Sequence, residues 1–424
     1  MAKKIPYGLT DYVLVMTDNY YYVDKTQYID LLEQTGRFLF LIRPRRLGKS
    51  LFLNMLNCYY DVKYADRFEE LFGNQYIGKH PTAEQGKYLV LRFNFSMVRA
   101  TDDKLEAAFN RHISLETAYF ASVYASYFKP DFQEQLKLIP EAAGRLEYIC
   151  LCAKEQGLSI YLLIDEYDNF TNTILSSKGN DVYHSLTHDS GFYSSFFNVV
   201  KGVTTGAEAP VKRMFITGVS PVTLDDVTSG FNIGTNITTN EQFNSMVGFS
   251  ESELHEMLSY YQSEGMLADS IDDIVRMMKP WYDNYCFAKE CIGQTMYNSD
   301  MVLYFLNNYL QRKRPPSEMV DRNIRTDYSK LRYFIRIDRM QEEGCSVITK
   351  LIDTGEVNGN VIKDSFPAEN LADPGNFTSL LYYFGLLTYD RMEYGETIMK
   401  VPNLAVREQI YSYLVEAMKE RDSI

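Results

Sequence analysis

The chain has 424 residues, of which 43 are lysine or arginine and 56 are aspartate or glutamate, giving a formal net charge of −13. Hydrophobic residues make up 46% and charged residues 23%, which is ordinary for globular proteins and excludes a fibrous or low-complexity chain. The length is too great for one compact core and predicts two or three domains. The acidic balance excludes a protein that coats nucleic acid through its overall charge.

The N-terminus and the cysteines bear on the compartment. The charged start Met1–Lys4 has no apolar run behind it, so it is not a signal peptide. No run of about 18 apolar residues predicts a membrane span. The six cysteines show no Cys-x-x-Cys spacing. The sequence therefore predicts a reduced, cytoplasmic protein without a membrane partner.

Short apolar runs predict the buried strands of a parallel sheet. These runs lie at residues 38–42, 88–95, 160–164 and 214–218. Longer segments with helical spacing separate them, including 102–128 and 133–156. Strands that alternate with helices predict an α/β fold with right-handed crossovers.

The pattern changes after about residue 245. Helices are predicted at 250–264, 267–279, 299–311, 326–354, 377–384 and 404–420, and a hairpin at 386–389 and 397–401. A polar, proline-containing break at 312–317 indicates a boundary. A helix followed by a hairpin is typical of a winged helix. We therefore expect a core over 1–245, a helical lid over 246–314 and a small winged-helix-like module over 315–424.

The strongest motif follows the first strand and opens a helix: Arg43-Pro-Arg-Arg-Leu-Gly-Lys-Ser50. Gly48 allows the backbone to approach phosphate, and the helix N-terminus presents N–H donors to it. Lys49 is expected to reach the β- and γ-phosphates, and Ser50 to hold Mg²⁺. The pattern departs from the usual phosphate loop because Arg43 stands where the first glycine is expected. The alternative is a solvated basic turn.

The residues expected to bind nucleotide in this loop are Arg45, Arg46, Gly48, Lys49, Ser50 and Leu51. Planar guanidinium groups bond phosphate in a bidentate way, so Arg45 and Arg46 are candidates to make up for the backbone bonds that the first glycine would otherwise allow. The alternative is that both are solvated charges on an exposed loop. The aromatic run Tyr20–Tyr22 is either a cover for the adenine ring or an ordinary packing patch.

A second motif, Ile160-Tyr-Leu-Leu-Ile-Asp-Glu-Tyr-Asp168, places carboxylates at the tip of a buried strand. Open α/β sheets bind their ligands at such tips. Asp165 is expected to bind Mg²⁺, and Glu166 to activate the attacking water as a general base. Lys49 and Glu166 are thus the predicted catalytic pair, and Ser50 and Asp165 the predicted metal ligands. Asp168 either supports them or caps the next helix.

Two further features bear on the same site. The strand at 88–95 comes between the phosphate-loop strand and the carboxylate strand, which fits ATPases that carry a catalytic glutamate. The strand at 214–218 ends in polar residues, and Thr217 and Ser220 are candidates to sense the γ-phosphate. A simple passage from strand to loop explains them equally well.

Several stretches together resemble the AAA-ATPase-like family of bacteria. They are Ile5-Pro-Tyr-Gly8, Tyr22-Val-Asp-Lys-Thr26, Arg43–Ser50, Leu163–Asp168, Thr217–Pro221, Thr228–Ile233 leading to Gly248-Phe249, Tyr282–Phe287 and Tyr297-Asn298. The resemblance covers roughly residues 4–310. It implies a P-loop ATPase core in which the arginine at position 43 is a family trait. It also implies that members often continue into a nuclease-like domain of the PD-(D/E)XK type, of which we find no Asp…Glu-x-Lys core here.

Residues 312–339 form a basic segment, with nine cations and four anions in a chain that is acidic overall. This segment is a candidate nucleic-acid surface, a source of an arginine acting in trans on the ATP site, or a solvated helix face.

Three functions remain open at this point. The first is Mg²⁺-dependent ATP binding and hydrolysis that drives a conformational switch, with self-association as a further expectation. The second is a nucleotide-gated module that binds DNA or protein with little hydrolysis of its own. The third is a degenerate ATPase fold that serves as a scaffold.

Overall fold

A computed structural model describes residues 1–99, 104–188, 190–223, 226, 234–321, 346–359 and 361–412. Its centre is a five-stranded parallel sheet in the order β2–β3–β4–β1–β5. The strands are β1 (Phe38–Ile42), β2 (Leu89–Asn94), β3 (Ile160–Asp165), β4 (Val211–Gly218) and β5 (Thr235–Asn236). The four predicted strands are confirmed, and the two-residue edge strand β5 is an addition.

The sheet order corrects one expectation about the strand at 88–95. This strand, β2, precedes the carboxylate strand β3 in the sequence but lies at the edge of the sheet, beyond β3. The strand that separates β1 from β3 in space is β4. Sequence order alone does not give this arrangement, because a crossover can pass over one or more strands.

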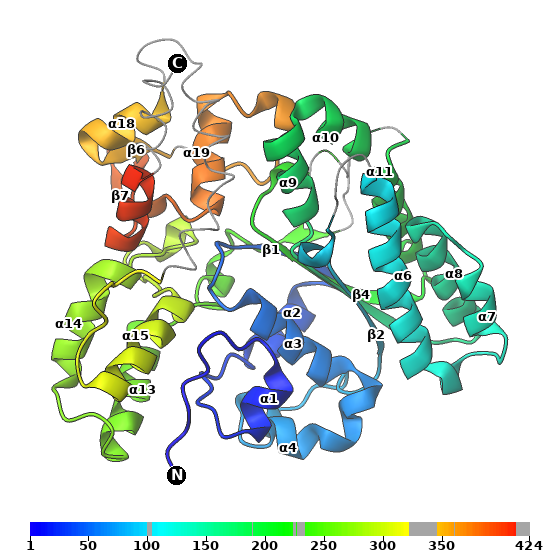
Figure 1. Ribbon diagram of the computed structural model, residues 1–424, viewed down its shortest axis with the longest axis horizontal. Coiled ribbons are helices and arrows are strands. Elements are labelled where there is room, and N and C mark those ends of the chain that lie inside the picture. Colours follow the sequence, from blue (N-terminus) through cyan, green and yellow to red (C-terminus); the bar gives the residue numbers. More distant parts are fainter. Residues whose placement is uncertain are drawn as a thin grey trace.

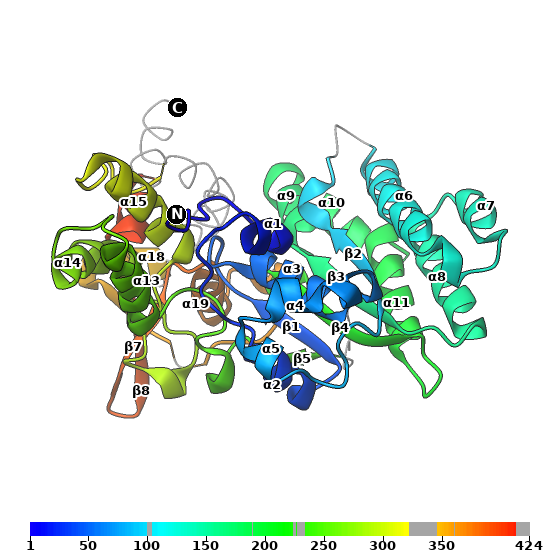
Figure 2. The same ribbon diagram turned by 90° about the horizontal axis from the view of Figure 1, so that it is seen from below.

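Helices cover both faces of the sheet (Figures 1 and 2). Phe215 of β4 contacts Phe52 of α3 (Lys49–Tyr60), while Phe93 of β2 contacts Phe196 of α11 (Phe192–Thr204). The register pairs Phe93 with Ile164, and Ile164 with Ile216, so Phe93 and Phe215 point to opposite faces. Burial on both faces explains why the strand sequences are continuously apolar.

The other helices of the core are of 4 to 10 residues, apart from α6 with 19 and α8 with 14. They are α1 (Tyr12–Thr17), α2 (Tyr28–Thr35), α4 (Phe68–Phe72), α5 (Tyr76–Lys79), α6 (Leu105–Val123), α7 (Phe132–Lys137), α8 (Ala142–Glu155), α9 (Asn169–Lys178) and α10 (Asn180–Thr187). The predicted helix at 133–156 is two helices, because Pro140 cannot continue a helix from the residues before it. Figure 1 shows α6, α7 and α8 at one end of the molecule.

The helical lid lies at the other end of the sheet (Figures 1 and 2). It contains α13 (Glu251–Ser263), α14 (Ile271–Tyr282) and α15 (Ser299–Arg312), close to the predicted bounds. Ser250 and Glu253 form a reciprocal capping box that fixes the start of α13. The lid helices share an apolar cluster of their own, to which Tyr7 and Tyr21 of the N-terminal segment also pack.

The C-terminal module has the predicted order of a helix followed by a hairpin. It contains α18 (Val347–Thr354), β6 (Glu356–Asn358), α19 (Pro374–Tyr383), β7 (Thr388–Glu393) and β8 (Glu396–Lys400). The strands form an antiparallel sheet in the order β6–β8–β7. Tyr394 and Gly395 both have positive φ, as a two-residue hairpin turn requires. Residues 404–412 are helical, while the predicted helical residues 326–345 and 413–420 lie outside the described residues.

The protein is thus an α/β protein with a parallel-sheet core, a helical lid and a winged-helix-like C-terminal module. Most of the described buried apolar residues of the C-terminal module belong to the same cluster as those of the sheet, so this module packs directly on the core, while Val320 and Ala405 belong to the cluster of the lid. In the part of the chain described, no helix combines the length and the apolar character that a membrane crossing needs.

Candidate functional site

The loop between β1 and α3 has the conformation of an anion-binding turn. Gly48 has a φ of 95°, in the region that favours glycine, and α3 begins directly after it at Lys49. Arg46, with a φ of 65°, is a second left-handed residue in the same turn. The first N–H groups of α3 have no carbonyl partner within the helix, so they are available to an anion at this end.

A cavity of about 410 Å³ opens beside this loop, within the size range of ligand sites. Its wall comes from the loop and the start of α3, the segment after β3, the N-terminal segment and the lid. The residues from the loop, from the start of α3 and from the segment after β3 are Arg45, Arg46, Leu47, Gly48, Lys49, Ser50, Leu51, Phe52, Glu166 and Asn169. Asp165, the last residue of β3, is not among the lining residues. The predicted loop residues and Glu166 therefore lie around one cavity, although they come from segments about 115 residues apart in the sequence.

Lys49 is buried, with 6% of its surface exposed. Its Nζ donates to the carbonyl oxygens of Arg43 at 2.9 Å and of Pro44 at 2.8 Å, so the side chain lies back along its own loop. Burial lowers the pKa of Lys49 to about 8, although the nearby carboxylates, first among them Glu166, act in the opposite direction. The ammonium group is therefore held at the cavity by two neutral acceptors.

Asp165 ends β3 and is 1% exposed. Its Oδ1 accepts a hydrogen bond of 2.6 Å from Thr217 Oγ1 on the neighbouring strand β4. Its Oδ2 is buried and has no hydrogen-bond partner among the described residues. A buried carboxylate oxygen without a donor is unfavourable unless a cation or another donor meets it. Thr217 thus orients Asp165.

Glu166 follows Asp165 in a strained conformation. Its φ of 50° is unusual for a residue with a side chain, and such strain clusters at functional sites. Asn169 Nδ2 donates to Glu166 Oε2, and both residues line the cavity. The contact between them fixes the direction of the carboxylate.

Asp168 has a structural role in this structure. Its carboxylate accepts from the backbone N–H groups of Val219 and Ser220 and from Asn172 Nδ2, at 2.7–3.2 Å. It makes no side-chain cap to α9. These bonds join the end of β3 to the segment after β4. Ser220 is fully buried beside it and does not line the cavity.

The phosphate loop is tied to the lid through Arg46. Its Nη1 lies 2.9 Å from Asp300 Oδ2 and 3.7 Å from Asp321 Oδ2. The carbonyl oxygen of Arg46 also accepts from the N–H of Asp300 and from Ser299 Oγ, at the first turn of α15. Arg45 lines the same cavity. The loop and the start of α15 are therefore joined by main-chain and side-chain bonds.

Arg43, in the place of the first glycine, points away from the cavity. It is completely buried, donates to the carbonyl oxygens of Thr238 and Phe243, and stacks on Phe287 with its guanidinium carbon 4.2 Å from the ring centroid. The side chain fills space behind the loop, so a residue with a long side chain is compatible with the loop conformation.

Part of the cavity wall is aromatic. Tyr21 and Tyr22 line the cavity together with Gly8, Val23 and Phe249. Tyr21 also packs against Tyr260 and Tyr261 of α13. Tyr20, the third member of the predicted aromatic run, is not among the lining residues.

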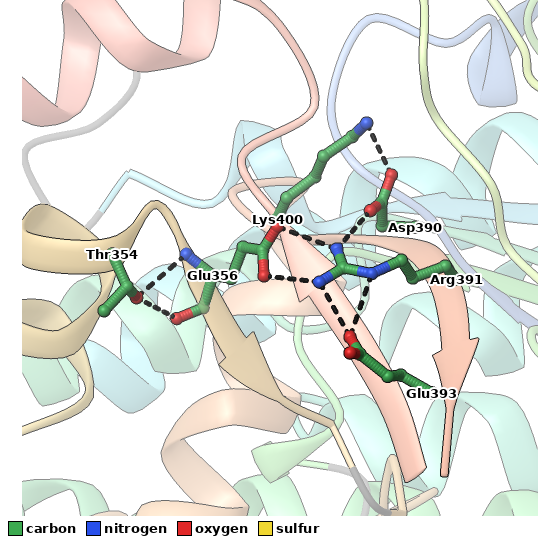
Figure 3. Close-up of polar contacts among 6 residues, drawn as sticks. All are labelled: Thr354, Glu356, Asp390, Arg391, Glu393 and Lys400. Carbon is green, nitrogen blue, oxygen red and sulfur yellow. Dashed lines mark hydrogen bonds and ion pairs between the residues drawn. The ribbon is translucent and has the colours of Figure 1, made fainter. Parts of the chain in front are cut away.

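The predicted basic segment is described only in part. Arg312, Lys313 and Arg314 are exposed at the end of α15, while residues 322–339 lie outside the described residues. On the C-terminal sheet, Arg391 bonds three carboxylates, those of Glu356, Asp390 and Glu393, and Lys400 pairs with Asp390 (Figure 3). With two cations against three carboxylates, this hairpin surface is not basic.

Sequence reasoning missed several residues of the site. Ser299 and Asp300 line the cavity from α15, some 250 residues after the loop, and no motif marks them. Asn169 was detectable from its position three residues after Glu166. The pairing of Thr217 with Asp165 follows from β4 lying beside β3, which the sequence order concealed.

Solved structures with similar folds include the Walker-type ATPase PABY2304 of Pyrococcus abyssi, at 11% identity and a TM-score of 0.45. That match covers 91% of this chain and 94% of the other. The ORC2 protein of Aeropyrum pernix, solved as ADPNP–ADP complexes, matches at 9% identity and a TM-score of 0.41, over 97% of this chain and 98% of the other.

Among curated proteins, the uncharacterized protein in the vnfD 5′ region of Azotobacter chroococcum mcd 1 is 25% identical over 315 residues, which are 72% of this chain. The chain spans about half the length of that relative, 52%. A family described as predicted AAA-ATPases matches residues 6–228, just over half of the chain. The chain therefore belongs to this family of predicted AAA-ATPases.

Proposed function

We propose that the chain binds ATP together with Mg²⁺ in this cavity, hydrolyses it, and uses hydrolysis to switch the contact between core and lid. The observation that carries the proposal is that Lys49, Ser50 and Glu166 line the same cavity of about 410 Å³. We further propose that residues 1–245, 246–314 and 315–424 are the units that move relative to one another.

The loop has the groups that a triphosphate needs. Gly48 and the free N–H groups at the start of α3 supply main-chain donors, and Lys49 supplies a positive charge. Arg45 and Arg46 are placed on the cavity wall to add bidentate bonds, and Leu51 lies in the first turn of α3. On binding, Lys49 exchanges two neutral carbonyl acceptors for phosphate oxygens, which attract the ammonium more strongly.

The donor set also fits a hard cation. The hydroxyl of Ser50 and the carboxylate of Asp165 are oxygen ligands of the kind that Mg²⁺ prefers. The unpartnered Oδ2 of Asp165 supports this assignment, because a cation would satisfy it, while Thr217 already holds Oδ1. Mg²⁺ held by Ser50 and Asp165 would supply positive charge that offsets the charge of the phosphates.

Glu166 is the proposed general base. It orients a water for in-line attack on the γ-phosphorus and accepts the proton as the bond to the β-phosphate oxygen breaks. Asn169 keeps the carboxylate directed by donating to Oε2. Tyr21 and Tyr22 are the proposed contacts for the adenine ring, since they are aromatic residues that line the same cavity.

The coupling to the lid is proposed to pass through Arg46. In this structure its guanidinium pairs with Asp300 on α15. Phosphate oxygens compete with a carboxylate for the same cation, so filling the cavity changes a bond between the core and the lid. Hydrolysis and release would restore it.

The test uses phosphate release by purified protein with MgATP. We expect steady release by the wild type and none by Lys49→Ala. Glu166→Gln is expected to bind ATP as well as the wild type but to release phosphate at least about 100-fold more slowly. Glu264→Gln, on an exposed part of the lid, is the matched control and should match the wild type. Wild-type release no faster than that of Lys49→Ala would refute hydrolysis.

A second function, nucleic-acid binding, is favoured by three consecutive exposed cations at 312–314. Neutralising all three should weaken binding to duplex DNA and reduce its salt dependence. Neutralising the exposed Lys129, Lys137 and Lys154 at the far end of the core is the control. Equal affinities for the two triple variants would count against the proposed surface.

A further inference from the structure

The dipeptide Arg43–Pro44 contacts both the cavity lysine and the C-terminal module. On the cavity side, its two carbonyl oxygens accept both described hydrogen bonds of Lys49 Nζ, at 2.9 and 2.8 Å. The position of the Lys49 ammonium in this structure is therefore set by the dipeptide.

On the other side, Arg43 is a buried cation without an ion pair to any described residue. Its two terminal nitrogens donate to the carbonyls of Thr238 and Phe243 and its plane stacks on the ring of Phe287, while its buried Nε has no hydrogen-bond partner among the described residues. Burial lowers its pKa to about 10, so the arginine stays charged at neutral pH. Keeping a buried cation costs free energy, and here it replaces the small glycine that a phosphate loop ordinarily has at this point.

The C-terminal module contacts both Phe287 and Pro44. The hydroxyl of Tyr382, on α19, donates to the carbonyl of Phe287 at 2.7 Å, so the ring under Arg43 is fixed by the module. Gly385, just after α19, faces Pro44 so closely that an added Cβ would lie 2.6 Å from Pro44 Cγ.

We propose that Arg43–Pro44 is a positioning element that couples the occupancy of the nucleotide cavity to the C-terminal module. This inference rests on the function proposed above. When phosphate draws Lys49 away, the carbonyls of the dipeptide lose their donor, and the dipeptide relaxes against Phe287 and Gly385. A close-packed core transmits such a shift because it has no free volume to absorb it.

The coupling is reciprocal by thermodynamic necessity. A partner that binds the C-terminal module and moves α19 changes nucleotide affinity by the same factor by which nucleotide changes partner affinity. Binding at the phosphate loop and binding at the winged-helix-like module are then energetically coupled.

The experiment compares two glycine variants of the same module. Gly385→Ala and Gly395→Ala both add a Cβ at a positive φ, 75° and 86°, but only the first meets Pro44; Gly395 has nothing within 4 Å. Two quantities are measured: the Kd for a non-hydrolysable ATP analogue with Mg²⁺, and the hydrogen exchange of residues 374–400 with and without it.

We expect the analogue to change exchange in α19 of the wild type and of Gly395→Ala, with Kd values within twofold. Gly385→Ala should weaken binding about tenfold, or about 1.4 kcal/mol, and lose the exchange response. If the wild type binds and Gly385→Ala behaves as Gly395→Ala does, the coupling is overturned while the proposed function stands. If the wild type binds no analogue, the proposed function fails and the coupling fails with it.

Arg43 provides a second pair of variants if Gly385→Ala does not fold. Arg43→Lys keeps a cation that reaches one of the two carbonyls, whereas Arg43→Met keeps only the length of the side chain. We expect a partial exchange response in α19 for the lysine variant and none for the methionine variant. A full response in Arg43→Met would overturn the coupling.

Discussion

Replacing Thr217 by valine tests how the site holds Asp165. Thr217 Oγ1 donates to Asp165 Oδ1 at 2.6 Å, and both side chains are buried. The second carboxylate oxygen, Oδ2, has no hydrogen-bond partner among the described residues. Valine has the same branching but no hydroxyl, so the carboxylate loses its only described hydrogen bond. Hydrogen bonds to charged groups contribute about 1.5–3 kcal/mol. We therefore expect Thr217→Val to lower the unfolding free energy by about that amount.

Thermal unfolding of Thr217→Val is compared with that of Thr204→Val, whose buried hydroxyl donates only to neutral carbonyls of α11. The control should lose about 1 kcal/mol. If Asp165 is a metal ligand, the Mg²⁺ concentration for half-maximal phosphate release should also rise, by about 10-fold or more, because loss of an outer-shell partner weakens metal binding. Equal unfolding temperatures for the two variants, with an unchanged Mg²⁺ requirement, would refute the role of Thr217.

Three further predictions concern stability and base recognition. Burial raises the pKa of Asp61 to about 6 in the folded state, above its ordinary value of about 4. Ionisation of Asp61 therefore lowers the stability of the folded state as the pH rises from about 4 to 6, and the loss is complete above about pH 6. Asp61→Asn, which cannot ionise, should raise the melting temperature at pH 8 but not at pH 4. Lys25 Nζ lies 2.6 Å from Glu253 Oε1 in a largely buried ion pair. Glu253→Gln leaves the buried ammonium without its counter-charge, so it should lower the free energy of unfolding in urea by about 3 kcal/mol. A loss below about 0.5 kcal/mol would contradict this. Tyr21→Leu should weaken ATP binding about tenfold in a fluorescence titration, while Tyr20→Leu, outside the cavity wall, should leave it unchanged.

Local patterns in the sequence predicted most of the elements. β1 was predicted with its observed bounds, and the predicted lid helices differ from the observed ones by a few residues. These elements have unbroken apolar runs or clear helical spacing, so the secondary structure that the local sequence favours is the one that the tertiary contacts also favour. The two-residue strand β5 and the three-residue β6 were missed, because such short strands have no periodicity of their own.

The site could be predicted only where its residues are close in sequence. Lys49, Ser50 and Glu166 belong to motifs, and the structure brings them to one cavity. The bond between Arg46 and Asp300 joins residues 254 apart, and although Arg46 belongs to the phosphate-loop motif, nothing in the sequence marks Asp300 as its partner. The burial of Arg43 is equally hidden, because a cation in a basic loop looks solvated until the packing around it is known.

The central claim is that the cavity beside Gly48 binds MgATP through Lys49, and calorimetric titration of the purified chain with MgATP tests it most directly. We predict one binding site per chain for the wild type and a loss of at least about 100-fold in affinity, or about 2.7 kcal/mol, for Lys49→Ala. Wild-type protein should also melt at a higher temperature with saturating MgATP, whereas the variant should not. No heat of binding for the wild type, or equal affinity in Lys49→Ala, would contradict the claim.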